Sequence, residues 1–274
     1  GRDLKTSIHY GLQKKISSLF EDKSGAAIVT DTQGQIMALL SAPSFDPNLF
    51  VQQGNSSQIK TILEDSKLPL FNRAIGGQFH PGSVFKPFVA IAALEEEKID
   101  KDFVFDDPGV IVIQTPYGTF SYSNWFFNQY GSREGEIGLI RAIARSTDTF
   151  FYKIGELTGP DAMAEWANKF GLGEKTGIDI PGEIGGLIPS PEWKKEVKGE
   201  SWFLGNTYHM AIGQGDLSIT PIGENSAIAV IASGGKYCSP KIADTPDCKS
   251  IAISKTNLEL VKKQILICKV RCRY

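Results

Sequence analysis

Two side chains of this sequence have the types and the spacing of a nucleophile and its base. Ser83 follows a turn signal, Pro81-Gly82, and Lys86 lies three residues further on. Because serine is a favoured helix N-cap, we expect a helix to begin directly after Ser83. Residues three apart on a helix share one face, so the Lys86 amine is expected to reach the Ser83 hydroxyl. A hydroxyl with an amine base beside it can act as an acyl-accepting nucleophile.

The residues after Ser83 have the apolar period of a buried helix, and Pro87 falls where a missing N–H costs least. The expected buried stripe consists of Phe85, Phe88, Val89, Ala92 and Ala93. The Ser-x-x-Lys pattern also occurs at Ser57–Lys60 and Ser233–Lys236, in a polar run and before a Gly-Gly pair. Only Ser83 has both a turn before it and an apolar helix behind it. The alternative is an ordinary N-cap serine with a solvated lysine.

A second candidate pair lies at the expected junction of two helices, 137–144 and 149–157. Ser146 and Asp148 supply a hydroxyl and a carboxylate two residues apart. A junction can direct both side chains into one site, whereas a regular helix would point them about 200° apart. The pair could hold Lys86 by hydrogen bonds and carry a proton to a leaving amine. The alternative is a helix cap, because Ser and Asp both favour helix starts.

The order of elements predicts the fold class. Hairpins are expected at 26–40 and 110–123, a buried helix at Pro221–Ser233 and a surface helix at Ser254–Lys263. The chain begins with strands, has a helix-rich middle and returns towards strand near Lys236–Ile242. This pattern indicates an α/β (α+β) layer with a helical insertion.

Composition excludes several functions. A net charge of −2 over 274 residues gives no reason to expect a nucleic-acid partner, and no apolar run is long enough to span a membrane. Cys238, Cys248, Cys268 and Cys272 do not have the spacing of a zinc site, so we expect no metal and no cofactor. Either a Cys238–Cys248 disulfide, if the chain is exported, or unpaired thiols fit the sequence.

Several segments, in one order and spacing across about Asp3 to Lys263, resemble the transpeptidase domain of class B penicillin-binding proteins of the cell-elongation type. They are Ala26–Asp31 with Ile36–Pro43 and Ser44–Asn48, Phe71–Ala74, Pro81–Pro87, Ser146–Tyr152, Gly171–Gly173 with Thr176–Asp179, and Ala211–Gly215 with Thr220-Pro221.

The resemblance implies a penicillin-binding/β-lactamase-like serine acyltransferase fold with a helical subdomain. It also implies a D,D-transpeptidase that cross-links peptidoglycan stem peptides and binds β-lactams. Ser83 would be the acylated nucleophile and its N–H half of the oxyanion hole; Lys86 would be the base, and Ser146 would pass the proton on. Ser83, Ser146 and Asp148 would also bind the substrate. The resemblance places the domain outside the cytoplasmic membrane, tethered by a helix not in this chain, with a membrane glycosyltransferase and wall-synthesis proteins as partners. An inactive binding or scaffold module, and an unrelated Ser-Lys hydrolase, are the alternatives.

Two departures from the family pattern matter. Asp148 stands where Asn is commoner, and a carboxylate favours a charged Lys86. We therefore expect Asp148 either to lie slightly off Lys86 or to share a proton with it. The third family box, Lys-Thr/Ser-Gly, is also missing from its place, since Lys175-Thr176-Gly177 comes too early. We predict a transpeptidase domain at 1–263, with sheet-lobe parts 1–75 and 236–263 and a helical lobe at about 76–235. The tail 264–274 resembles nothing in the family, so we expect a premature end or a frameshift that removes the third box, the central strands after it and the closing helix.

Overall fold

The computed structural model describes residues 3–52 and 54–271. The chain folds into two compact units, each assembled from three segments of sequence. Unit 1 comprises Gly1–Phe79, Gly171–Gly186 and Ile219–Ser250; unit 2 comprises His80–Phe170, Leu187–Ser218 and Ile251–Tyr274. The chain passes between these two units more often than it passes between the predicted lobes. The extent of the domain, 1–263, stays a prediction.

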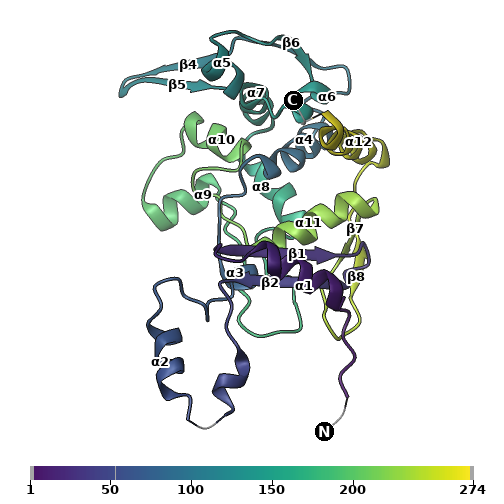
Figure 1. Ribbon diagram of the computed structural model, residues 1–274. Coiled ribbons are helices and arrows are strands. Elements are labelled where there is room, and N and C mark those ends of the chain that lie inside the picture. Colours follow the sequence, from purple (N-terminus) through teal and green to yellow (C-terminus); the bar gives the residue numbers. More distant parts are fainter. Residues whose placement is uncertain (1–2, 53, 272–274) are drawn as a thin grey trace. The chain divides into compact units, whose positions relative to one another are not determined.

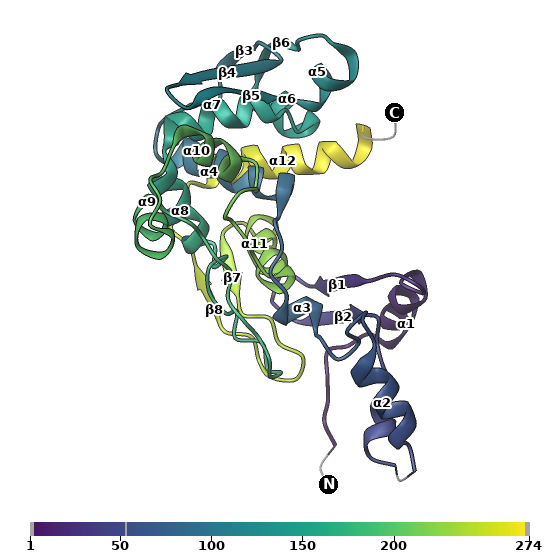
Figure 2. The same cartoon turned by 90° about the vertical axis from the view of Figure 1, so that its left-hand side faces the viewer.

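A two-stranded antiparallel hairpin forms the centre of unit 1, as predicted. In it β1 (Gly25–Thr30) pairs with β2 (Ile36–Ala42), with Ile28 opposite Leu39. Every second side chain of β2, from Ile36 to Ala42, is buried, which is the period expected of a strand that faces a core on one side. Helix α1 (Tyr10–Leu19) packs on β2, and α11 (Pro221–Ser233) packs on β1 (Figure 2).

Helix α11 has the bounds that the sequence predicts. Pro221 occupies its first turn, and Gly234 ends it in the left-handed conformation with φ of 83°. The chain then forms β7 (Lys236–Cys238), which pairs with β8 (Cys248–Ser250). A disulfide joins Cys238 to Cys248 across this pair, so the first of the two cysteine alternatives holds here. The other helical elements of unit 1 are η1 (Pro47–Phe50), α2 (Ser56–Glu64) and α3 (Arg73–Gly76).

Helix α4 (Lys86–Glu95) is the core of unit 2. All its residues from Lys86 to Leu94 are buried, so the predicted single stripe is wrong: the helix is enclosed on every side. It contacts α7 (Asp148–Thr158), α8 (Pro160–Lys169) and α12 (Lys255–Arg271) (Figure 1). The Phe88 ring packs edge-on against Phe170, with 5.0 Å between ring centroids.

Unit 2 also contains strand pairs and further helices. The predicted hairpin is present as β4 (Val110–Thr115) and β5 (Gly118–Ser123), and β3 (Val104–Asp107) pairs with β6 (Gly135–Gly138). The remaining elements are η2 (Gly82–Phe85), α5 (Trp125–Tyr130), α6 (Leu139–Arg145), α9 (Pro191–Trp193), the π-helix η3 (Lys194–Lys198) and α10 (Leu204–Ala211).

Helix α12 is longer than the predicted Ser254–Lys263 and continues to Arg271. Of the predicted non-family tail, 264–271 belongs to this helix and 272–274 lies outside the described residues; its origin stays a prediction. None of the helices in the described part of the chain has both the length and the apolar composition that a membrane span requires.

Candidate active site

Ser83 lies in a tight 3₁₀ turn, η2, that leads into α4. The residue at the N-cap of this turn is Pro81 and not Ser83, so the predicted capping role of Ser83 is wrong. The Ser83 side chain is exposed instead and bonds elsewhere. Its backbone N–H is among the first of the turn, where no carbonyl of the turn can accept it. An N–H in this position is available to an oxygen of a bound substrate.

The backbone of Gly213 packs against Gly82, the residue that precedes Ser83 in this turn. Gly82 has φ of 57°, and its N–H donates to the carbonyl of Gly213 at 2.9 Å. Gly213 also has a left-handed φ, 73°, and a Cβ added to it would lie 2.1 Å from the Gly82 oxygen. Only glycine fits at such a separation. The Ala211–Gly215 segment therefore supports the backbone next to Ser83.

Lys86 is the first residue of α4, and its side chain is 3% exposed. Its Nζ donates to the Ser146 carbonyl and to Ser146 Oγ, both at 2.9 Å, and to Asp148 Oδ1 at 2.5 Å. The alternative of a solvated lysine is therefore wrong. Burial lowers the pKa of Lys86 below its ordinary 10.5, and this outweighs the neighbouring Asp148 carboxylate, which raises the pKa.

Ser146 has an uncommon backbone conformation. It ends α6 with φ of 55° and ψ of 45°, a left-handed conformation in which glycine is usual. The N–H of Ser146 bonds to Ile143 O and that of Thr147 to Ala142 O, which is the Schellman arrangement. A non-glycine residue held there costs about 1 to 3 kcal/mol. Such strain is kept where the side chain has a use, and Ser146 Oγ donates to Ser83 Oγ at 2.9 Å.

The four predicted site residues therefore come together in unit 2. The contacts run in sequence from Ser83 through Ser146 to Lys86 and on to Asp148. One geometric expectation is wrong: among the described residues, no hydrogen bond joins Lys86 directly to Ser83, and Ser146 Oγ bonds both of them instead. The first arrangement expected for Asp148 is also wrong, since its carboxylate touches the amine.

The other occurrences of the motifs are structural. Ser57 lies in α2 and not in a loop, and its Lys60 is exposed and pairs with Glu64. Ser233 bonds backbone groups at the end of α11. In Lys175-Thr176-Gly177, Thr176 and Gly177 both donate to the Glu183 carboxylate, so this segment forms a turn within unit 1.

A cavity of about 560 Å³ lies on the side of α7 that carries Tyr152, one turn after Asp148. It is lined by Ser121, Tyr122, Ser123, Tyr152, His209, Ile212, Gln214 and Gly215. Burial lowers the pKa of His209 and raises that of Tyr152. The sequence reasoning missed this cavity, because its residues come from three distant segments. Within the described ranges, no three His, Cys, Asp or Glu side chains gather as a metal site would require.

The fold and the Ser83–Ser146–Lys86 contacts are those expected of the transpeptidase domain of a penicillin-binding protein. The sequence model of the family described as penicillin-binding protein transpeptidase domain matches residues 25–271. The chain belongs to this family, which confirms the resemblance found in the sequence.

The curated relatives that the chain matches are peptidoglycan D,D-transpeptidases. The chain is 36% identical over 243 residues to peptidoglycan D,D-transpeptidase MrdA of Acinetobacter baumannii, covering 88% of this chain and 35% of that protein. PBP2 of Pseudomonas aeruginosa, solved with WCK 5153, superposes with a TM-score of 0.87 at 32% identity, covering 97% of this chain and 59% of that one. PBP2 of Helicobacter pylori, solved with MreC, gives 0.87 at 30% identity, with 94% and 48% covered. The chain thus spans about a third of the length of the curated relative.

Proposed function

We propose that this chain is the transpeptidase domain of a peptidoglycan D,D-transpeptidase that cross-links stem peptides through a Ser83 ester. The observation that carries the proposal is the line of contacts from the exposed Ser83 hydroxyl, through Ser146, to a buried amine. Membership of the transpeptidase family and the names of the relatives support the substrate class.

In the first step, Ser83 Oγ attacks the carbonyl carbon of the penultimate D-Ala of a stem peptide. The hydroxyls of Ser83 and Ser146 rotate freely enough that the same 2.9 Å contacts carry the proton from Ser83 to Ser146 and from Ser146 to Lys86. Burial favours the neutral amine that this step needs. Asp148 then stabilises the lysinium that forms.

The carbonyl oxygen becomes an oxyanion, and the Ser83 N–H at the start of the 3₁₀ turn donates to it. The C–N bond breaks when Lys86 returns its proton, through Ser146, to the amine of the terminal D-Ala. The ester on Ser83 is then attacked by an amine of a neighbouring stem peptide. That amine gives its proton to Lys86, the C–O bond breaks, and Ser83 recovers its proton. No cofactor enters these steps.

A β-lactam presents a strained amide that resembles D-Ala-D-Ala, so Ser83 would open the ring and keep the acyl group. The proposed place of action is the extracytoplasmic side of a bacterial membrane, with an anchor helix outside this chain. The Cys238–Cys248 disulfide supports this location, since such bonds persist in oxidising compartments. A membrane glycosyltransferase and wall-synthesis proteins are the proposed partners; a similar structure, the PBP2 of H. pylori, was solved with MreC.

Labelling with a fluorescent penicillin tests the proposal. We expect a covalent label on the chain that is lost in Ser83→Ala and kept in Ser57→Ala, which removes the serine of another Ser-x-x-Lys pattern. Release of D-Ala from a stem pentapeptide then separates the transpeptidase from an unrelated serine hydrolase. A folded chain that takes no label would refute the proposal in favour of a binding module.

A further inference from the structure

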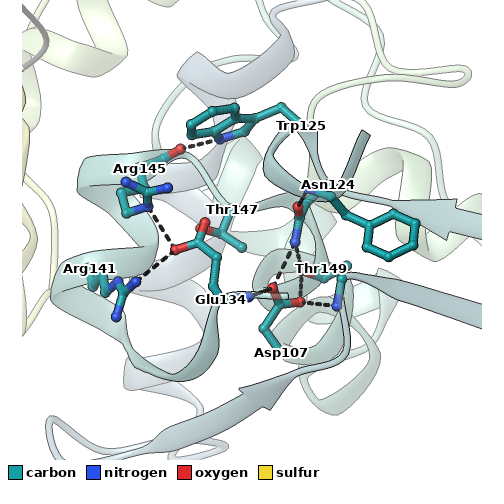
Figure 3. A network of polar contacts seen from close by, with 10 residues as sticks. Asp107, Asn124, Trp125, Glu134, Arg141, Arg145, Thr147 and Thr149 are labelled. Atoms are coloured by element: carbon teal, nitrogen blue, oxygen red, sulfur yellow. Dashed lines mark hydrogen bonds and ion pairs between the residues drawn. The ribbon is translucent and has the colours of Figure 1, made fainter. Parts of the chain in front are cut away.

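The residues on either side of Ser146 and Asp148 point away from the site. Arg145, Thr147 and Thr149 alternate with them along the chain, and these side chains end on two buried carboxylates, Glu134 and Asp107 (Figure 3). The junction between α6 and α7 is thus held by every second side chain, while the side chains between them face Lys86.

The first contact set is centred on Glu134, whose side chain is fully buried. One of its oxygens accepts from Thr147 Oγ1 at 3.1 Å, and the other from Arg145 Nε at 2.7 Å. Arg141 adds a second guanidinium 3.4 Å away. Thr147 is the N-cap residue of α7, yet its hydroxyl makes no capping bond. The Thr147 hydroxyl donates to the Glu134 carboxylate instead.

The second contact set is centred on Asp107, which is also fully buried. Asp107 accepts from Thr149 Oγ1 at 2.6 Å, from Asn124 Nδ2 at 2.9 Å and from the Gly109 N–H at 2.9 Å. It also accepts from the backbone N–H of Glu134 at 3.1 Å, which joins the two sets. The donors come from four places in the sequence, so the Asp107 carboxylate connects β3 to the start of α7.

The contacts of Glu134 and Asp107 can hold Ser146 in its uncommon backbone conformation. Ser146 is held left-handed, and without its neighbours the residue would relax towards a more populated conformation. Its Oγ and its carbonyl are both Lys86 acceptors, so any rotation of the junction would break two bonds of the amine at once. Thr147 and Thr149, which flank Asp148, bond to Glu134 and Asp107 and can therefore keep the junction from rotating.

We propose that Glu134 and Asp107, through Thr147 and Thr149, are positioning residues that hold Ser146 and Asp148 against Lys86. The inference rests on the proposed function for its effect on acylation. Neither carboxylate touches Ser83 or Lys86 in the described structure, so neither is a catalytic residue. Their role is to keep the Ser146 hydroxyl and the Asp148 carboxylate within hydrogen-bond distance of the Lys86 amine.

The test compares three variants that change a buried threonine. Thr147→Val keeps the shape and removes the hydroxyl; Thr147→Ser restores it. Thr158→Val is the matched control, because Thr158 is a buried threonine at the other end of α7 and, within the described part of the chain, its hydroxyl bonds only the Ile154 carbonyl. We expect Thr147→Val to slow acylation by fluorescent penicillin by about tenfold to a hundredfold, as small displacements of reacting groups do. Thr147→Ser should recover most of the rate, and Thr158→Val should lose none.

A second measurement does not depend on activity. The Cε resonance of Lys86 in ¹³C-lysine-labelled protein, assigned with Lys86→Arg, is followed against pH. Thr147→Val should move the titration midpoint from its wild-type position, and Thr158→Val should not. Should Thr147→Val not fold, Glu134→Gln takes its place, since it keeps the shape and removes the charge that binds Arg145.

The two readouts separate the two claims. A wild-type chain that takes no label would end the proposed function, and the Lys86 titration would still decide the positioning role. A Thr147→Val protein that folds and matches wild type in acylation and in titration would overturn the inference. Equal effects from Thr147→Val and Thr158→Val would do the same, because they would show a general loss of packing.

Discussion

The contact between Gly213 and Gly82 offers a sharp test of how the nucleophile turn is held. The change is Gly213→Ala. The new Cβ would lie 2.1 Å from the Gly82 oxygen and 2.7 Å from its nitrogen, and both of these atoms are backbone. They belong to the residue before Ser83, so they can move only if the nucleophile moves with them.

The cost has two parts. A Cβ in a left-handed residue costs about 1 to 2 kcal/mol. Overpacking in an enclosed place costs about 1 to 3 kcal/mol more. Together they predict a loss of about 2 to 5 kcal/mol in the free energy of unfolding. Gly199→Ala separates the parts, because Gly199 has a similar φ of 68° and a Cβ there would meet nothing within 4 Å.

Urea unfolding of the three proteins gives the comparison. Gly199→Ala should lose only the first part, about 1 to 2 kcal/mol, and Gly213→Ala clearly more. The acylation rates of the folded Gly213→Ala and Gly199→Ala proteins are then measured with fluorescent penicillin. Gly213→Ala should acylate about tenfold or more slowly, since its clash displaces the Ser83 turn, while Gly199→Ala should acylate at the wild-type rate. Equal stability losses, or equal acylation rates, would refute the idea that Gly213 supports the nucleophile turn.

Three further outcomes are expected. Ser146→Gly should be more stable than Ser146→Ala by about 1 kcal/mol in urea unfolding, because both lack the hydroxyl and only alanine keeps a Cβ in the left-handed conformation; equal stabilities would argue against strain at this residue. Asp148→Asn removes the carboxylate that raises the pKa of Lys86, so the rise of acylation rate with pH should occur at lower pH; an unchanged or higher midpoint in the pH profile would contradict this. Replacing Cys238 and Cys248 by serine should lower the free energy of unfolding by about 2 to 3 kcal/mol, as reduction of the wild-type protein should; a reduced wild-type protein as stable as the oxidised one would speak against it.

The four site residues could be predicted from the sequence because their signals are local. A turn before Ser83, an apolar helix behind it and Lys86 three residues on are all read within one short stretch. The same holds for Ser146 and Asp148, which lie at a helix junction that the structure confirms between α6 and α7. Hairpin β1–β2 and helix α11 have equally local signals, and the structure contains both.

What the sequence did not predict depends on contacts between distant segments. The position of Ser146 between Ser83 and Lys86 follows from a left-handed residue that no propensity assigns to serine. Glu134 and Asp107 read as ordinary polar residues, because only folding brings them under the α6–α7 junction. Likewise the burial of α4 on all sides comes from three helices far along the chain, so its own apolar period showed only one face.

In the proposed function, Asp148 in place of the commoner asparagine is compatible with Lys86 as the base, because two opposing effects act on the amine. Burial disfavours the charged lysine and the carboxylate favours it, and burial is the larger effect. The net lowering of the Lys86 pKa favours the neutral amine that the proposed first step requires. Once the amine is protonated in that step, the carboxylate at 2.5 Å is the partner that a buried cation requires. The same contact makes the amine a weaker proton donor to the leaving group. Asp148 should accordingly favour transfer of the proton from Ser83 to Lys86 and disfavour its transfer from Lys86 to the leaving amine. Removing the Asp148 carboxylate should therefore change the rates of these two steps of acylation in opposite directions.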